Sequence, residues 1–327
     1  MATKKKERST GKKVLIGFLA LILLISAGGI YLFDKYLGDM SRVDISKNDE
    51  ELNISPESSK KDDKIINIAL FGIDTRANDY DSATRSDTIM IASLDKQHKK
   101  IKLTSIMRDT YVNIPDRGYD KINHSYAFGG PELAIKTINK NFDMNIKNYV
   151  TVNFSAMAKI VDAIGGVEID VKDYEIRHLP GVNSTGLQNL SGDQAVSYSR
   201  IRYSGDGDYE RTQRQRKVLE NVIYKVLDSK SLTQALALIE TLTPNVETSL
   251  STVDMVGLAT DVFSSNIKTL ENTRLPLDEY SKGGTWNGVY YLKPNSLVDN
   301  VKYLHEFIYE DGGYQASGIV NEISDGI

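Results

Sequence analysis

The longest uninterrupted apolar stretch of the chain lies near its start. Residues 14–33, VLIGFLALILLISAGGIYLF, carry no charge, and about 20 apolar residues in an α-helix cover a hydrocarbon core of about 30 Å. This stretch predicts one transmembrane helix over residues 14–33, preceded by a basic tail over residues 1–13. Residues 34–63 are polar with little apolar periodicity, so we interpret them as an extracellular spacer.

The charge before this stretch predicts its orientation. Residues 1–13 hold six lysine or arginine residues and one glutamate, and positive charge beside the first helix keeps that side in the cytoplasm. A cleaved signal peptide has the same polarity, and Ser26-Ala27-Gly28 offers small residues for a peptidase. The uncharged run is longer than the usual signal-peptide core of about 7 to 15 residues. We therefore predict a retained single-pass anchor in the cell membrane, with the following domain outside the cell.

Beyond the spacer, three mostly apolar runs predict strands. They cover residues 65–71, 88–94 and 101–106, and Gly72 closes the first of them. Short and nearly continuous apolar runs are typical of strands that are buried on both faces of a sheet. Two further short strands are predicted at residues 149–152 and 167–171.

Between and after these strands, apolar residues recur every three to four positions, which indicates amphipathic helices. Predicted helices cover residues 131–142, a segment from Ser155 to Gly165-Gly166, and residues 212–227, 232–242, 253–263 and 296–309. Strands interleaved with helices predict an α/β fold, an α/β/α sandwich with a central mixed sheet, over residues 64–313. Residues 314–327 are polar and are predicted to be a flexible C-terminal tail.

Composition limits the class of protein. The chain has 327 residues, 40% of them apolar, which is enough to build one large core. It contains no cysteine, so no disulfide supports an exported domain, and this suits a Gram-positive surface. The formal net charge is −4 although the basic tail is positive. Any anion-binding site outside the membrane must therefore be a local cluster of basic residues.

Charged residues gather at the predicted strand ends. Asp74 follows the first strand, Arg85 and Asp87 precede the second, and Arg108 and Asp109 follow the third. The loops at strand ends of an α/β sheet are where ligands usually bind. The sequence therefore points to this edge of the sheet as a candidate site.

A second group of polar residues follows later in the chain. Arg200 and Arg202 share a face if their segment is extended, and Arg211, Arg214 and Gln215 share one side of the next predicted helix. Guanidinium groups match phosphate oxygens, and carboxylates without an arginine partner can hold Mg²⁺. Arginines that converge with two aspartates describe a pyrophosphate site. Each arginine could instead belong to an ordinary surface ion pair, and the clustering alone does not decide between these interpretations.

Other candidate motifs are weaker. The chain has four histidines without metal-ligand spacing, interpreted as surface or turn residues: His98, His124, His178 and His305. The Gly129-Gly130 and Gly165-Gly166 pairs fit a helix start and a helix C-cap better than a phosphate loop. Several serines precede a lysine by three residues, but the companion motifs of a serine nucleophile are absent from the sequence.

At the charged residues the sequence closely resembles the LytR-CpsA-Psr family of Gram-positive cell-wall enzymes. Seven short stretches match the family's motifs in the family's order, across about residues 65–227. They are Phe71-Gly72-Ile73-Asp74, Arg85-Ser86-Asp87-Thr88, Ser105-Ile106-Met107-Arg108-Asp109-Thr110, Lys121-Ile122-Asn123, Ile164-Gly165-Gly166-Val167, Arg200-Ile201-Arg202 and Arg211-Thr212-Gln213-Arg214-Gln215. Seven ordered matches are far more specific than any one of them.

The resemblance implies a role for each charged residue. Asp74 and Asp87 are expected to hold Mg²⁺ or Mn²⁺. Arg108, Asp109 and Arg202 are expected to be catalytic, with Asp109 either a general base or a structural partner of a nearby arginine. The residues expected to bind pyrophosphate are Arg85, Arg108, Lys121, Arg200, Arg202, Arg211, Arg214 and Gln215.

Enzymes of this family are understood to transfer anionic glycopolymers, such as wall teichoic acid or capsule, from an undecaprenyl-pyrophosphate carrier onto peptidoglycan. The expected partners are a polyprenyl-pyrophosphate-linked glycopolymer, peptidoglycan and the membrane. A prenyl lipid also needs an apolar trough, which the helices around residues 134–138 and 157–161 are expected to supply. Two alternatives stay open: a prenyl-pyrophosphate phosphatase that uses the same residues, and a non-enzymatic module that binds wall polymers. Nucleic acid is not an expected partner, because a 13-residue cytoplasmic tail cannot form a DNA-reading motif.

Overall fold

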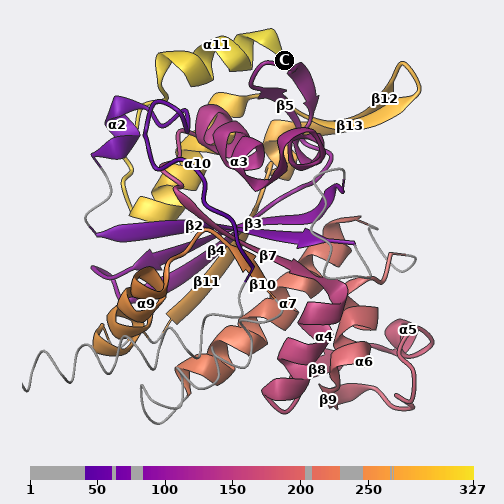
Figure 1. Ribbon diagram of the computed structural model, residues 1–327. Coiled ribbons are helices and arrows are strands. Elements are labelled where there is room, and N and C mark those ends of the chain that lie inside the picture. The colour runs from indigo at the N-terminus through magenta and orange to yellow at the C-terminus, as the bar shows by residue number, and fades with distance from the viewer. Residues whose placement is uncertain are drawn as a thin grey trace, which may run out of the picture.

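The computed structural model has a mixed α/β fold around a central seven-stranded sheet (Figure 1). The structure describes residues 41–60, 64–74, 84–202, 208–228, 246–265, 267 and 269–327. Among these residues no helix combines the length and the apolar character needed to cross a membrane. The transmembrane helix predicted over residues 14–33 and the helix predicted over residues 232–242 lie outside the described residues.

The central sheet has the strand order β1-β10-β7-β2-β3-β4-β11. Its strands are β1 (Ser41–Arg42), β2 (Ile65–Ile73), β3 (Ser86–Asp95), β4 (Lys100–Ile106), β7 (Asn148–Asn153), β10 (Val246–Thr248) and β11 (Thr269–Leu275). Strands β2, β4, β7 and β11 run in one direction, and β3 runs in the opposite direction. This confirms the predicted central mixed sheet. The carboxyl ends of the parallel strands and the start of β3 therefore meet at one edge of the sheet.

Three helices cover one face of the sheet (Figure 1): α3 (Ile122–Phe142), α10 (Leu297–Tyr309) and α11 (Gly318–Gly326). Phe71 and Ile73 of β2 pack on this side in one apolar core with Ile135 and Ile138 of α3. Burial of apolar surface contributes roughly 25 cal/mol per Å², so this solid layer supplies much of the free energy of folding. Helix α3 is interrupted at Gly129-Gly130, where Gly130 has a φ of 63°, and its second half begins at the predicted helix start.

The opposite face carries α4 (Phe154–Ala163), α7 (Asp208–Leu227) and α9 (Thr252–Ser264), with α6 (Gly192–Ser199) packed on α4 and α7 (Figure 1). The strand predicted at residues 167–171 is present as β8 (Val167–Val171). It pairs with β9 (Gly186–Leu190) in a separate hairpin beside these helices. Short helical turns complete the fold: α2 (Pro56–Ser59), α5 (Asp173–Ile176) and the 3-10 turn η2 (Asp278–Tyr280).

Two more hairpins lie near the edge of the sheet where β2 and β4 end and β3 begins, which we call the site edge. They are β5 (Tyr111–Ile114) with β6 (Gly118–Lys121), and β12 (Ser281–Trp286) with β13 (Val289–Pro294). The β12–β13 hairpin projects from the body of the molecule (Figure 1). The backbone N–H of Leu292 donates to the carbonyl of Asp109 at 2.9 Å. The projecting hairpin is therefore fastened to the loop that follows β4.

Two segments predicted to be extended or flexible pack against the domain instead. Within the predicted spacer, β1 pairs with β10, and Leu52 and Ile54 are buried in the core. Within the predicted flexible tail of residues 314–327, α11 buries Val320 and Ile323 against α3 and α10. These predictions are wrong for the described parts of both segments, because a few apolar side chains at the right spacing are enough to dock a mostly polar segment.

Strands β2 and β3 approach each other closely where they reach the site edge. Their pairing shifts register between Gly72 and Ile73, and a Cβ atom on residue 72 would lie only 2.8 Å from the Cβ of Thr88. Carbon atoms that are not bonded prefer separations of about 3.5 to 4.0 Å, so a side chain does not fit there. Glycine at position 72 therefore lets β2 and β3 pair closely at the end where Asp74 and Asp87 lie beside each other.

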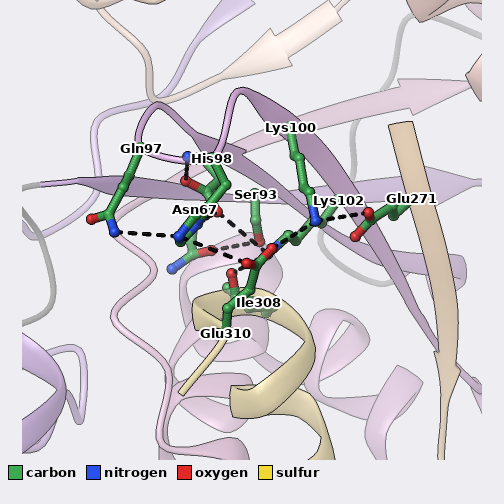
Figure 2. Close-up of polar contacts among 10 residues, drawn as sticks. Asn67, Ser93, Gln97, His98, Lys100, Lys102, Glu271, Ile308 and Glu310 are labelled. Atoms are coloured by element: carbon green, nitrogen blue, oxygen red, sulfur yellow. Dashed lines mark hydrogen bonds and ion pairs between the residues drawn. The ribbon is translucent and has the colours of Figure 1, made fainter. Parts of the chain in front are cut away.

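At the other end of the sheet, a buried lysine joins β3, β4 and the residues after α10 (Figure 2). The side chain of Lys102 is fully buried, and its Nζ lies 3.3 Å from Asp95 Oδ2 and 3.0 Å from Glu310 Oε1. It also donates to the carbonyl of Ile308 at 2.9 Å. Asp95, His98 and Glu310 bring three potential metal ligands together. Because Lys102 already contacts two of them and supplies positive charge, we interpret this cluster as structural.

Replacing Glu310 by glutamine should make stability less sensitive to acid. Hydrogen bonds from Lys100 and Lys102 lower the pKa of Glu310 from 4.5 to about 2. A carboxyl with a lowered pKa in the folded chain contributes stability above its unfolded pKa and loses it as the pH falls through the folded value. Between about pH 4.5 and 2 the free energy of unfolding should fall more steeply for the parent than for Glu310→Gln.

Urea unfolding of the full-length protein across this pH range measures the difference. Glu306→Gln changes an exposed glutamate of α10, the helix that Glu310 follows, and serves as the control, which should follow the parent. Identical pH dependence of the parent and Glu310→Gln would show that the Lys102 cluster contributes nothing to acid stability.

Candidate functional site

The charged residues predicted at strand ends converge at one edge of the sheet. Asp74 follows β2, Asp87 lies at the start of β3, and Arg108 and Asp109 follow β4. Two pockets lie beside this edge, and Asp74 and Asp87 line both of them. The two carboxylates therefore form a boundary that the pockets share.

The first pocket, which we call the arginine pocket, has a volume of about 300 Å³ and is lined by Asp74, Asp87, Phe154, Ser199, Arg200, Arg202, Arg211 and Gln215. Arg200 Nη2 donates to Asp74 Oδ1 at 2.8 Å. Its guanidinium carbon lies 3.8 Å from the centroid of the Phe154 ring, a cation–π contact that holds a charged group beside an apolar surface. Arg200 is thus oriented by one carboxylate and one aromatic ring.

Two polar side chains reach the arginine pocket from α7. Arg211 and Gln215 are four residues apart, and they are 2% and 9% exposed. The side-chain oxygen of Gln215 has no hydrogen-bond partner among the described residues. A buried polar atom without a partner costs roughly 1 to 3 kcal/mol, so this position favours a ligand that brings a donor.

The second pocket, which we call the lysine pocket, has a volume of about 560 Å³ and is lined by Asp74, Thr84, Arg85, Asp87, Arg108, Asp109, Lys121, Asn123 and His124. Arg108 Nη1 donates to Asp87 Oδ1 at 2.6 Å. Lys121 Nζ lies 2.8 Å from Asp109 Oδ1, and Arg108 Nε lies 3.5 Å from Asp109 Oδ2. These four side chains form a row of alternating charge, which fixes each of them by charge-assisted contacts.

An apolar cavity of about 240 Å³ lies between the sheet and helices α4 and α7. It shares Phe154, Ser199 and Gln215 with the arginine pocket, so apolar space adjoins the guanidinium groups. The apolar trough predicted beside residues 157–161 is thus matched by a cavity. The trough predicted beside residues 134–138 is wrong, because Ile135 and Ile138 are fully buried in the solid core on the other face of the sheet.

Arg214 lines neither pocket, in contrast to the prediction that it binds pyrophosphate. Its Nε donates to Glu175 Oε1 at 2.7 Å, and the two side chains are only 4% and 3% exposed. Burial lowers the pKa of Arg214, but hydrogen bonds to Glu175 and Glu210 outweigh this effect, so that its pKa is raised. Successive helix residues are about 100° apart, which turns Arg214 away from the pocket that Gln215 reaches.

The buried Arg214 still serves the site indirectly. Its Nη1 donates to the backbone carbonyl of Ile201 at 3.2 Å, and Ile201 separates the two arginines of the arginine pocket. The segment before them is helical, in contrast to the extended conformation considered above, because α6 continues to Ser199 and Arg200 is its C-cap. Arg200 and Arg202 nevertheless line one pocket.

Sequence reasoning missed five residues that line the pockets, and two of them, Thr84 and Asn123, are uncharged residues of the lysine pocket that were given no role. Phe154 and Ser199 are uncharged and carried no signal of their own. His124 was interpreted as a surface or turn residue, but it lines the lysine pocket, and its Nδ1 lies 2.7 Å from Asp120 Oδ2. Its place directly after Lys121-Ile122-Asn123, one of the matched stretches, was the signal that could have found it.

Comparison with known proteins identifies the family. The LytR_cpsA_psr family model matches residues 34–305. The polyisoprenyl-teichoic acid–peptidoglycan teichoic acid transferase TagU of Enterococcus faecalis is 35% identical over 273 residues, which is 79% of this chain and 86% of that protein. The protein of the same name in Oceanobacillus iheyensis is 33% identical over 306 residues, 88% of this chain and 92% of that protein. The chain belongs to the LytR-CpsA-Psr family.

Solved structures agree with this assignment. TagT bound to LI-WTA superimposes with a TM-score of 0.66 at 29% identity, covering 83% of this chain and 100% of that one. The LytR-CPS2A-psr family protein YwtF (TagT) with bound octaprenyl pyrophosphate lipid gives a TM-score of 0.62 at 28% identity, covering 82% and 99%. Both share the mixed α/β fold, and one of them holds a lipid pyrophosphate.

Replacing Glu175 by alanine should strongly destabilise the domain. The substitution leaves the Arg214 guanidinium buried without its main carboxylate, and breaking a buried ion pair costs about 3 to 5 kcal/mol. Asp170→Ala is the matched control, because Asp170 pairs with Lys172 while both side chains are more than half exposed and exposed pairs contribute about 0 to 1 kcal/mol. Urea unfolding measures both variants. Equal free energies of unfolding for the two variants would contradict the structural role of Arg214.

Proposed function

We propose that this protein is a membrane-anchored phosphotransferase that moves an anionic glycopolymer, of the wall teichoic acid or capsule type, from an undecaprenyl-pyrophosphate carrier to peptidoglycan. One observation carries this proposal. Asp74 and Asp87 are shared by an arginine pocket that adjoins an apolar cavity and by a lysine pocket that contains Asp109. A lipid-linked donor and a sugar acceptor can thus reach the same point from two sides. The names of the relatives as transferases support it.

The donor pyrophosphate would bind in the arginine pocket. Arg200, Arg202 and Arg211 present planar groups that pair with phosphate oxygens through two parallel hydrogen bonds. The prenyl chain would enter the adjoining apolar cavity. Its volume of about 240 Å³ lies below the roughly 300 to 1,000 Å³ of ordinary ligand sites. A long prenyl chain therefore requires α4 and α7 to move apart.

Asp74 and Asp87 fit a divalent cation by their chemistry. Each carboxylate has one oxygen in a hydrogen bond with an arginine, which leaves its second oxygen for another ligand. Mg²⁺ is commonly held by one or two carboxylates together with substrate phosphates and water, and Mn²⁺ accepts the same oxygen ligands. The ion would neutralise charge on the pyrophosphate.

The acceptor hydroxyl, in the lysine pocket, would attack the phosphorus on the sugar side of the pyrophosphate. Asp109 accepts the hydroxyl proton as general base. The new bond joins the polymer phosphate to peptidoglycan, and the bond from that phosphorus to the bridging oxygen breaks, so that prenyl phosphate leaves with the electron pair. Arg108 and Arg202 stabilise the charge that spreads over the phosphate oxygens. The pyrophosphate is already activated, so no ATP is required.

Replacing Arg202 by lysine should slow transfer about 30- to 1000-fold, because a charge-assisted contact worth about 2 to 4 kcal/mol is lost in the transition state while the net charge is kept. Asp87→Asn should abolish the response of the rate to Mg²⁺, because it removes the charge of one carboxylate. The assay measures transfer of polymer from a lipid-linked donor to peptidoglycan oligomers. Both variants should melt near the temperature of the parent.

Arg42→Lys, an exposed arginine on the edge strand β1, is the control and should transfer at the parental rate. Parental rates and an unaltered Mg²⁺ response for Arg202→Lys and Asp87→Asn would refute the assignment of the site. Release of free polymer phosphate without attachment to peptidoglycan would instead favour a phosphatase. Polymer binding that needs no metal and forms no product would favour the non-enzymatic module.

Filling the apolar cavity should weaken binding of the prenyl donor. Met157 lines the cavity on α4, and a tryptophan there occupies space that the chain needs, at a cost of about 1 to 3 kcal/mol in overpacking. Lys159→Trp places the same ring on the exposed side of this helix and is the control. The KM for a lipid-linked donor should rise for Met157→Trp only. A donor with a very short prenyl chain should show a smaller difference between the variants.

A further inference from the structure

A row of aromatic side chains begins beside the lysine pocket, on the β5–β6 and β12–β13 hairpins. Tyr111 stacks on Tyr119 with ring centroids 5.6 Å apart, and Tyr291 meets Tyr111 edge-on at 5.1 Å. Lys293 Nζ lies 4.3 Å from the Tyr111 centroid and 5.0 Å from the Trp286 centroid. We call these residues the aromatic platform: Tyr111, Tyr119, Trp286, Tyr291 and Lys293.

The aromatic platform is joined to the lysine pocket at two points. Lys121, which pairs with Asp109 in that pocket, lies 5.6 Å from the centroid of the Tyr291 ring. The backbone of Leu292 is hydrogen-bonded to the carbonyl of Asp109 and bridges to Thr110. The platform is therefore attached to the loop that carries Asp109, the general base of the proposed reaction.

Large apolar side chains are exposed at the outer end of the platform. Trp286 is 37% exposed and Val289, which pairs with it across the hairpin, is 40% exposed, on a hairpin that projects from the body of the molecule (Figure 1). A Cβ atom on Gly284 would lie 2.8 Å from Trp286 Cη2, so glycine there lets the indole lie close against the strand. Exposed apolar clusters of this kind mark interaction sites.

We propose that the aromatic platform binds the saccharide chain of the acceptor, an inference that rests on the proposed function. Pyranose rings present C–H faces that stack on aromatic rings, and tyrosine and tryptophan add polar groups for the sugar hydroxyls. Lys293 and the exposed Lys282 supply positive charge for an acidic glycan strand. The donor's apolar cavity adjoins the arginine pocket, whereas the platform adjoins the lysine pocket. The platform therefore lies on the acceptor's side of Asp74 and Asp87.

Trp286 is the single tryptophan of the chain, so its fluorescence reports directly on the platform. Full-length protein in detergent is titrated with oligomers of N-acetylglucosamine and, separately, with uncross-linked peptidoglycan oligomers. Both should change the emission saturably, and the prenyl donor should not. A response to anionic phospholipid vesicles but to neither glycan would overturn the proposal in favour of a lipid-binding surface. No response to any of these ligands would also overturn it.

Kinetics test the same surface through transfer. Trp286→Ala should raise the KM for the acceptor about tenfold, the effect of losing one buried aromatic anchor in a complex, and should leave the KM for the donor near the parental value. Trp286→Phe keeps an aromatic ring and should recover most of the loss. Tyr224→Ala removes another exposed aromatic side chain, 44% exposed, from α7 and should change neither constant.

The outcomes separate this inference from the proposed function. If transfer is normal but glycans do not change the fluorescence and Trp286→Ala leaves the acceptor KM unchanged, the platform is refuted as a glycan-binding surface and the proposed function stands. If Trp286 fluorescence reports glycan binding but no polymer is transferred, the proposed function is refuted and the platform stands as a glycan-binding surface.

Discussion

Three of the cations gathered at one edge of this sheet are each held in place by a neighbouring carboxylate. Arg108 is held by Asp87, Lys121 by Asp109 and Arg200 by Asp74. Without such partners the basic groups would repel one another and turn outward into water. Paired in this way they are held in place in the folded chain, so a pyrophosphate that binds as we propose would meet donors that need little rearrangement.

The direction of the strands makes this pairing possible. Parallel β2 and β4 end at the edge where the antiparallel β3 begins, so carboxylates and basic groups from three strands meet in a small volume. The two faces of the sheet then differ in use. The face under α3, α10 and α11 is packed solid, whereas the face under α4 and α7 keeps an apolar cavity. A solid core and an apolar cavity therefore lie on opposite faces of the same strands.

The sequence predicts the strands and the charged strand ends because buried strands and amphipathic helices carry a strong apolar period. The stretches that match the family's motifs contain most of the residues that line the two pockets. The sequence alone did not separate Arg214 from Arg211 and Gln215, because the main partner that buries its side chain, Glu175, lies on a distant turn. The docking of α11 and the aromatic stacking between the two hairpins likewise depend on contacts between distant parts of the chain, which local patterns do not contain.

The close approach of β2 and β3 at Gly72 has a consequence for how this site can change over generations. The spacing of Asp74 and Asp87 depends on glycine at position 72, which has no Cβ. A Cβ there would lie 2.8 Å from the Cβ of Thr88. Any other residue at 72 would push the two strands apart and alter the distance between the carboxylates without touching either of them. The arrangement of the two carboxylates therefore constrains a neighbouring position whose own side chain takes no part in the site.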